Sequence, residues 1–139
     1  MKKIRVAITG NKGFLGKHLV ESLKNKKNIE FILFDKKKNS LFNPKTLESF
    51  LKGVDVVVHL AGDNRDSDSN LIKKNMLGTV GLLEAMVRYS PKAKKIFSSS
   101  FQVYGGKSAY GLSKRLDEDV IQIFSIIYGI KSIILIISN

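Results

Sequence analysis

The chain has 139 residues, enough for one domain with its own hydrophobic core. It contains no cysteine, which excludes a disulfide framework and a thiolate metal site, and its two histidines lie in different predicted elements, so no metal site is predicted. The formal net charge is +12, but the lysines stand singly or in small groups with few aromatic residues among them, so nucleic-acid binding is not predicted.

The first predicted element is an apolar strand over residues 4–9, in the place where a secretion signal would otherwise stand. No apolar run in the sequence approaches the roughly 20 residues that a membrane helix needs. These two features predict a cytoplasmic protein with no membrane partner.

Short β-branched runs alternate with longer amphipathic stretches along the whole chain. Strands are predicted over residues 4–9, 30–35, 55–60, 95–99 and 132–138, and helices over 14–24, 44–52, 71–89 and 108–128. Nearly continuous apolar strands are typical of parallel sheets that are covered on both faces. The alternation therefore predicts an α/β fold, a doubly wound parallel sheet with helices on both faces.

A glycine-rich loop, GNKGFLG at residues 10–16, joins the first predicted strand to the first helix. Gly10 permits the tight turn, Gly13 lets the backbone approach a pyrophosphate, and Gly16 allows the helix to pack closely on the strand. Phe14 and Leu15 are the first two residues of the predicted helix, whose N-terminus presents unpaired N–H groups to a phosphate. With a strand before it and a helix after it, this loop predicts a dinucleotide-binding site.

Asp35 ends the second predicted strand, where a carboxylate can accept hydrogen bonds from both ribose hydroxyls of an adenosine. The same carboxylate would repel a 2′-phosphate, which favours NAD. Three lysines, residues 36–38, follow at once and can pair with that phosphate, so NADP stays open. A simple turn role for Asp35 is the remaining alternative.

Five segments in order resemble the extended short-chain dehydrogenase/reductases, the NAD-dependent epimerase/dehydratase family that modifies nucleotide sugars. They are TGNKGFLG at 9–16, DVVVHLAG at 55–62, NMLGTVGLLEA at 75–85, IFSSSFQVYG at 96–105 and YGLSK at 110–114. The resemblance implies a Rossmann fold that ends after its sixth-strand position. It also implies that residues 1–139 are the NAD(P)-binding domain and that the substrate domain is absent from this chain.

The same resemblance implies further residues of the cofactor site. Leu60, Ala61 and Gly62 would line it at the end of their strand, and Asn75 would lie near the cofactor. Asn75 is equally well explained as an exposed polar residue of its helix.

Tyr110 and Lys114 are four residues apart and share one face of the last predicted helix. A free phenol has a pKa near ~10, and the Lys114 ammonium together with a nicotinamide ring is expected to lower it. Tyr110 would then exchange a proton with a sugar hydroxyl or carbonyl during hydride transfer. By the resemblance, Lys114 would hold the nicotinamide ribose, and Ser100 would hydrogen-bond the reacting substrate oxygen.

The chain departs from the related dehydratases, which carry Thr-Asp-Glu where this sequence has Ser100, Phe101 and Gln102. Neither Phe101 nor Gln102 can transfer protons as that carboxyl pair does, so dehydration is not predicted. The first hypothesis is an epimerase of a nucleotide sugar that uses transient hydride transfer.

The segments from Asp35 to Pro44 and from Ser100 to Tyr110 are short, which resembles the sugar-nucleotide reductases of capsule polysaccharide biosynthesis. An NADP-dependent reductase is therefore the second hypothesis, and a non-catalytic dinucleotide-binding module is the third. The third strand usual in the family is expected to be absent or reduced to residues 40–42. A homodimer through the helices at 71–89 and 108–128 is also expected.

Overall fold

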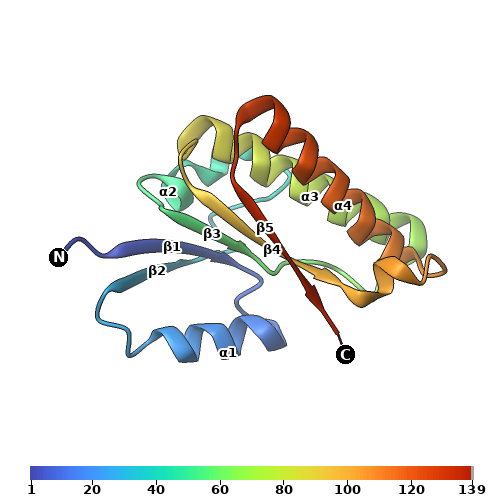
Figure 1. Cartoon of the computed structure of the whole chain (residues 1–139), viewed down its shortest axis with the longest axis horizontal. Coiled ribbons are helices and arrows are strands. Elements are labelled where there is room, and N and C mark those ends of the chain that lie inside the picture. The colour runs from blue at the N-terminus through green and yellow to red at the C-terminus, as the bar shows by residue number, and fades with distance from the viewer. Residues whose placement is uncertain (139) are drawn as a thin grey trace.

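A computed structural model describes residues 1–138 as one parallel sheet flanked by helices (Figure 1). The strands are β1 (Ile4–Thr9), β2 (Ile29–Leu33), β3 (Val56–His59), β4 (Lys94–Ser100) and β5 (Ser132–Ile137). The helices are α1 (Phe14–Leu23), α2 (Glu48–Leu51), α3 (Asp68–Tyr89) and α4 (Ala109–Tyr128), with 3-10 turns η1 (Pro44–Leu47) and η2 (Phe101–Tyr104). Each predicted strand and helix is present, with ends that move by a few residues.

The strands lie in the order β2-β1-β3-β4-β5, and every pairing is parallel. Val6 of β1 pairs with Phe31 on one side and with Val56 on the other. Since β2 and β3 leave β1 in opposite directions, the topology reverses between β1 and β3, and this switch point is where sheets of this kind bind ligands. The predicted doubly wound parallel sheet is confirmed.

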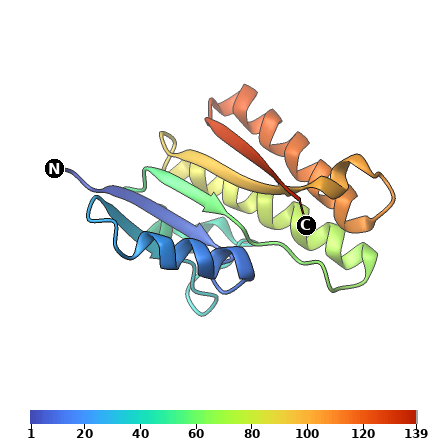
Figure 2. The same cartoon turned by 60° about the horizontal axis from the view of Figure 1, so that its bottom comes forward.

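Helices cover both faces of the sheet (Figures 1 and 2). Helix α1 packs on one face, where Val6, Ile8 and Val58 meet its apolar side. Helices α2, α3 and α4 pack on the other face over a larger core that includes Val57 and Phe97. Val57 and Val58 thus point to opposite faces, as successive residues of a strand do, which explains why β3 is apolar throughout.

The segment after β2 forms a turn at the place where the sequence resemblance implied that a strand is absent or reduced. Within the described residues, the only strand-like pairing of this segment is an isolated bridge between Ser40 and Asn43. The Thr46 hydroxyl accepts a hydrogen bond from the Ser40 N–H at 2.8 Å and fixes the turn. The expected loss of that strand is confirmed, and Leu41 of this segment packs on α3 instead.

Helix α3 runs without a break through two glycines, Gly78 and Gly81. A Cβ at Gly81 would lie 1.8 Å from the Leu41 carbonyl oxygen, whereas a Cβ at Gly78 would make ordinary contacts, the nearest being Leu41 Cδ1 at 3.5 Å. Gly81 is therefore the point at which the helix touches the backbone of the segment after β2.

Candidate functional site

The glycine loop closes the gap between β1 and α1 at the switch point. Gly10 has φ +71°, and a Cβ there would lie 2.6 Å from the Ala61 nitrogen. A Cβ at Gly16 would lie 2.1 Å from the Gly10 carbonyl oxygen, so the first turn of α1 rests on the loop backbone. The Gly13 N–H donates to the Gly10 carbonyl at 3.0 Å. The loop is thus packed against both α1 and the end of β3.

The N-terminus of α1 has no side-chain cap. Gly13 occupies the N-cap position, and the first turn contains no acidic residue. The first-turn N–H groups, those of Phe14, Leu15 and Gly16, therefore have neither an intrahelical acceptor nor a capping oxygen. Phe14 is 78% exposed, so this end of the helix opens to solvent. Such a terminus fits a phosphate, which would supply the missing acceptors.

Asp35 lies just beyond β2, partly buried, at the same edge of the sheet. One carboxylate oxygen accepts a hydrogen bond from the Lys37 N–H at 3.0 Å, which makes a local turn. Lys36, Lys37 and Lys38 are exposed. The turn role considered in the sequence is therefore observed, and the position of the carboxylate at the end of β2 also suits a ribose.

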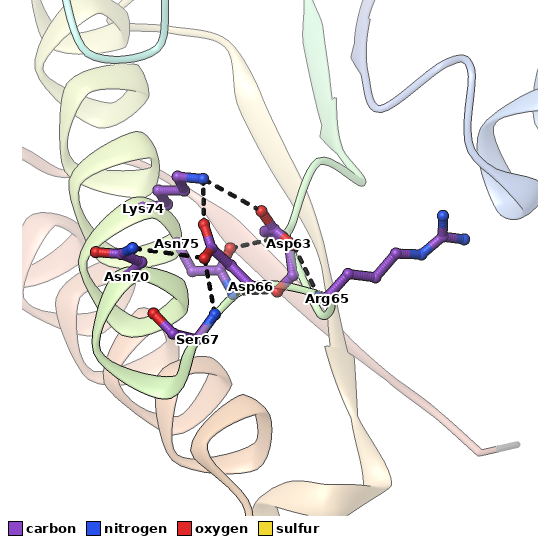
Figure 3. A network of polar contacts seen from close by, with 7 residues as sticks. All are labelled: Asp63, Arg65, Asp66, Ser67, Asn70, Lys74 and Asn75. Atoms are coloured by element: carbon purple, nitrogen blue, oxygen red, sulfur yellow. Dashed lines mark hydrogen bonds and ion pairs between the residues drawn. The ribbon is translucent and has the colours of Figure 1, made fainter.

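Asn75 of α3 is buried and holds the loop that follows β3 (Figure 3). Its Oδ1 accepts from the Asp63 N–H at 2.7 Å, and its Nδ2 donates to the Asp63 carbonyl at 2.9 Å. Nδ2 also donates to the Ser113 hydroxyl of α4 at 3.1 Å. Asn75 thus joins the loop, α3 and α4, and it is not the exposed polar residue that the sequence allowed.

An ion-pair network extends this hold on the loop (Figure 3). The Lys74 ammonium pairs with Asp66, and lies 3.6 Å from Asp63 Oδ2. The hydrogen bond with Lys74 lowers the pKa of the Asp66 carboxyl and raises that of Lys74. The side chain of Arg65 points away from this network. The loop is therefore fixed mainly from the α3 side.

Helix α4 begins where the Ser108 hydroxyl accepts from the Gly111 N–H at 2.9 Å, an N-cap. This start places Tyr110 in the first turn and Lys114 one turn later. Lys114 is 2% exposed, and its ammonium donates to the Ser98 carbonyl at 3.1 Å. It lies 5.7 Å from the centre of the Tyr110 ring, and a Cβ at Gly62 would be 3.1 Å from its Nζ. The fold brings Gly62, Tyr110 and Lys114 together.

Ser100 ends β4 and is buried. Its hydroxyl accepts from the Gln102 N–H at 3.2 Å, which caps the turn η2. The start of α4 packs tightly on that turn, since a Cβ at Gly111 would lie 2.5 Å from the Gln102 carbonyl oxygen. Ser100 therefore stands at the carboxyl edge of the sheet, on the turn that supports the helix of Tyr110.

Burial and Asp117 govern the electrostatics of Tyr110 and Lys114 in the protein alone. Burial raises the pKa of the Tyr110 phenol, and Asp117 adds to the increase. Burial lowers the pKa of Lys114, while Asp117 opposes that change. The lowering expected from Lys114 together with a nicotinamide ring stays a prediction, and in the protein alone the Lys114 ammonium donates to the Ser98 carbonyl.

Three buried titratable residues near this pair were not singled out from the sequence: His59, Lys95 and Asp117. The His59 ring lies within hydrogen-bond distance of the Thr9 and Thr79 hydroxyls, at 2.7 Å and 3.3 Å. Strand alternation places Lys95 on the same face of β4 as Phe97, and Asp117 follows Lys114 by three helical residues. The spacing of Lys95 from Phe97 and that of Asp117 from Lys114 could have indicated from the sequence that both residues are buried near the pair.

Within residues 1–138, no cluster of histidine and carboxylate side chains has the size of a metal site. Over the same range, no helix combines the length and the apolar composition required to cross a membrane.

The sequence is similar to proteins of known family. An archaeal protein provisionally assigned as a UDP-glucose 4-epimerase, from Methanocaldococcus jannaschii, is 32% identical over 96% of this chain and 55% of its own length. The UDP-2-acetamido-2,6-beta-L-arabino-hexul-4-ose reductase of Pseudomonas aeruginosa is 32% identical over 86% of this chain and 31% of its own length. The chain thus spans about half, or less, of these relatives.

A solved structure, the GDP-mannoheptose C4 reductase of Campylobacter jejuni with NADP bound, matches the fold with a TM-score of 0.85. It is 18% identical and covers 100% of this chain, which corresponds to 49% of that protein. The family model described as "NAD dependent epimerase/dehydratase family" matches residues 6–139. The chain therefore belongs to the NAD-dependent epimerase/dehydratase family.

Proposed function

We propose that residues 1–139 form the dinucleotide-binding domain of an NAD(P)-dependent enzyme that epimerises a nucleotide sugar. The position of the Lys114 ammonium is the main support. It lies against Gly62 at the end of β3, while the uncapped N-terminus of α1 opens at the end of the neighbouring strand β1. A pyrophosphate at that helix and a ribose at that ammonium would both lie at the switch point.

The residues at this edge fit a dinucleotide. The N–H groups of Phe14, Leu15 and Gly16 would bind the pyrophosphate, since the helix offers them no other acceptor. Leu60 and Ala61 would lie against the cofactor beside Gly10, and Asn75 would keep the loop after β3 in place.

Cofactor choice depends on the end of β2. The Asp35 carboxylate would accept hydrogen bonds from the adenosine ribose, which favours NAD. The exposed lysines 36–38 would instead pair with a 2′-phosphate, which keeps NADP as the alternative.

The bound nicotinamide would supply a hydride acceptor and donor. Tyr110 would take a proton from, and return it to, a sugar hydroxyl at its phenol oxygen, and Ser100 would hydrogen-bond the same oxygen. Lys114 would hold the ribose. Because burial and Asp117 keep the phenol of the protein alone protonated, a positive charge brought beside it is what would convert Tyr110 into a base.

Calorimetric titration with NAD and with NADP tests the cofactor. We expect saturable binding of NAD and weaker binding of NADP. If neither NAD nor NADP gives a heat of binding, the proposed function is rejected. Tighter binding of NADP than of NAD would favour the reductase.

Gly16→Ala is expected to weaken NAD binding at least about tenfold, because the added methyl group meets loop backbone and displaces the first turn of α1. Gly105→Ala is the matched control, since a Cβ there makes only an ordinary contact of 3.6 Å with the Gln102 carbonyl oxygen. Calorimetry on both variants, after circular dichroism has checked their folding, makes the comparison. Equal affinities would contradict the role given to the loop.

In an enzyme that carries this domain together with a substrate domain, Tyr110→Phe is expected to lower turnover of UDP-glucose by roughly 10²–10⁴-fold, because the phenol transfers the proton. NAD affinity should stay within about threefold, because the pyrophosphate and ribose contacts are unchanged. Tyr128→Phe, at the other end of the same helix and 52% exposed, is the control. Turnover is measured by chromatography of the epimeric products. Unchanged turnover in Tyr110→Phe would remove Tyr110 from the mechanism.

A reductase is the second candidate, favoured by the 32% identity to the Pseudomonas aeruginosa reductase and by the turn that replaces a strand after β2. It predicts net consumption of NADPH with a keto-sugar nucleotide, whereas an epimerase consumes no cofactor. A non-catalytic module would bind NAD and give no turnover in either assay.

A further inference from the structure

A second lysine lies under Lys114 in the interior of the protein. Lys95 of β4 is fully buried, and its ammonium nitrogen has no hydrogen-bond partner among the described residues. The Lys95 and Lys114 nitrogens lie 5.6 Å and 4.7 Å from the centre of one ring, that of Phe97. Two basic groups therefore share one aromatic ring between the sheet and α4.

Asp117 is the acidic member of this group. It is 1% exposed and follows Lys114 by three residues, on the same side of α4. The Thr79 hydroxyl of α3 opposes the rise in its pKa, while its Oδ1 has no hydrogen-bond partner among the described residues. Asp117 acts on both lysines, since its charge raises the pKa of each against the effect of burial.

Removing a charge from water costs free energy, and one buried carboxylate does not offset that cost for two buried ammonium groups. Hydrogen bonding distinguishes the two lysines. The Lys114 ammonium donates to the Ser98 carbonyl, whereas the Lys95 nitrogen has no acceptor. Burial, with Lys114 adding repulsion, lowers the pKa of Lys95 to about 7.

Other titratable groups border the cluster. From β3, His59 is held neutral, because burial and the two lysines lower its pKa. On α4, Glu118 bonds the Ser99 hydroxyl of β4 and adds to the raised pKa of Asp117, which is about 6. Tyr110 lies one turn before Lys114, and α3 contributes the Thr79 hydroxyl.

We propose that Asp117 is a positioning residue for Lys114: it is the buried counter-ion that keeps Lys114 in its ammonium form beside Gly62 and Tyr110, while Lys95 is the group that gives up its proton. The importance of this charge for catalysis rests on the proposed function. The protonation states proposed for Asp117, Lys114 and Lys95 are those of the protein without cofactor, so they can be measured in the cofactor-free protein.

The test follows the Cε resonances of isotope-labelled lysines by NMR in the cofactor-free protein, from about pH 6 to about pH 11. Lys95→Met and Lys114→Met assign the two signals. In the wild type we expect Lys95 to lose its proton near neutral pH and Lys114 to keep its proton well above it. Asp117→Asn should lower the Lys114 midpoint by at least about one pH unit, a tenfold change in its acid dissociation constant.

Asp119→Asn is the matched control, because it removes the same charge from an exposed position on the same helix. It should leave the Lys114 midpoint within about 0.2 pH units. Lys114→Met should raise the Lys95 midpoint, because it removes the ammonium that repels a charged Lys95, and it keeps the test decisive if Asp117→Asn does not fold. An unmoved Lys114 midpoint in folded Asp117→Asn, an unmoved Lys95 midpoint in Lys114→Met, or a wild-type Lys95 midpoint near its ordinary value would overturn the proposal.

Titration of the same samples with NAD separates the two ideas. Loss of NAD binding in the wild type, with the lysine midpoints as expected, would reject the proposed function alone. Normal NAD binding with unmoved midpoints would reject the role of Asp117 alone.

Discussion

Gly81→Ala is expected to destabilise the protein by about 3 kcal/mol or more, the largest effect of any single methyl group added to a helix here. The new Cβ would lie 1.8 Å from the Leu41 carbonyl oxygen, a backbone atom that no rotamer change can remove. Either α3 or the segment after β2 must therefore move, and both pack on the main core. Urea unfolding followed by circular dichroism measures the change.

Gly78→Ala is the control on the same helix, and it is expected to have the opposite sign. Its Cβ meets Leu41 side-chain atoms at 3.5 Å or more, and alanine is the better helix former, so the variant should gain about 0.5–1 kcal/mol. Equal stabilities of the two variants would mean that α3 does not touch the Leu41 backbone as described.

The second large effect concerns pH: the free energy of unfolding of the wild type is expected to increase as the pH rises above neutrality. In Lys95→Met most of this increase should be lost. The pKa of Lys95 is about 7 in the folded protein and 10.5 ordinarily. Between these values the unfolded chain binds more protons than the folded one, so the free energy of unfolding increases with pH. The burial cost of the charged lysine is present in full below that range. It is on the order of a few kcal/mol, at about 1.4 kcal/mol for each pKa unit.

Thermal unfolding from about pH 7 to about pH 10 measures this rise in the wild type, in Lys95→Met and in Lys94→Met. Lys94 is the adjacent residue of the same strand and is exposed, so its variant should keep the wild-type slope. If the wild-type stability does not change over this range, the pKa of Lys95 is the same in the folded and the unfolded protein, and the predicted effect of its burial is wrong.

Below pH 7 two other groups act in opposite directions, which is why the upper range is the informative one. Asp117 has a raised pKa of about 6, so its contribution falls as pH rises from 3.8 to about 6. His59 has a lowered pKa, so its contribution rises with pH up to 6.5. The two slopes oppose each other in that window.

The fold was predictable because its elements have clear periodicities. Val57 and Val58 are both apolar since each faces a helical layer, and this double burial marks a parallel strand. The length of the segment after β2 predicted the loss of a strand. Its docking on Gly81 was not predictable, because a contact between a carbonyl group and a glycine Cα leaves no pattern in the sequence.

The candidate site was predictable in position but not in its electrostatics. The spacing of Tyr110 and Lys114 and their order after the glycine loop predicted which edge of the sheet they occupy. The burial of Lys95 and Asp117 was missed, because charged residues on strands and helices are usually assigned to solvent. The lowered Tyr110 pKa expected with a nicotinamide bound stays a prediction, and the rise in the protein alone comes from burial and from Asp117, whose own burial the sequence did not indicate.

Gly10 leaves no room for a side chain between the loop after β1 and the loop after β3, whose backbones touch there. The two loops are consequently coupled, because a displacement of one backbone presses on the other. For a molecule bound across both loops as proposed, this contact would reduce the association free energy lost in ordering the protein. Substitutions in either loop should then weaken binding of both halves of such a molecule, rather than only of the half they face.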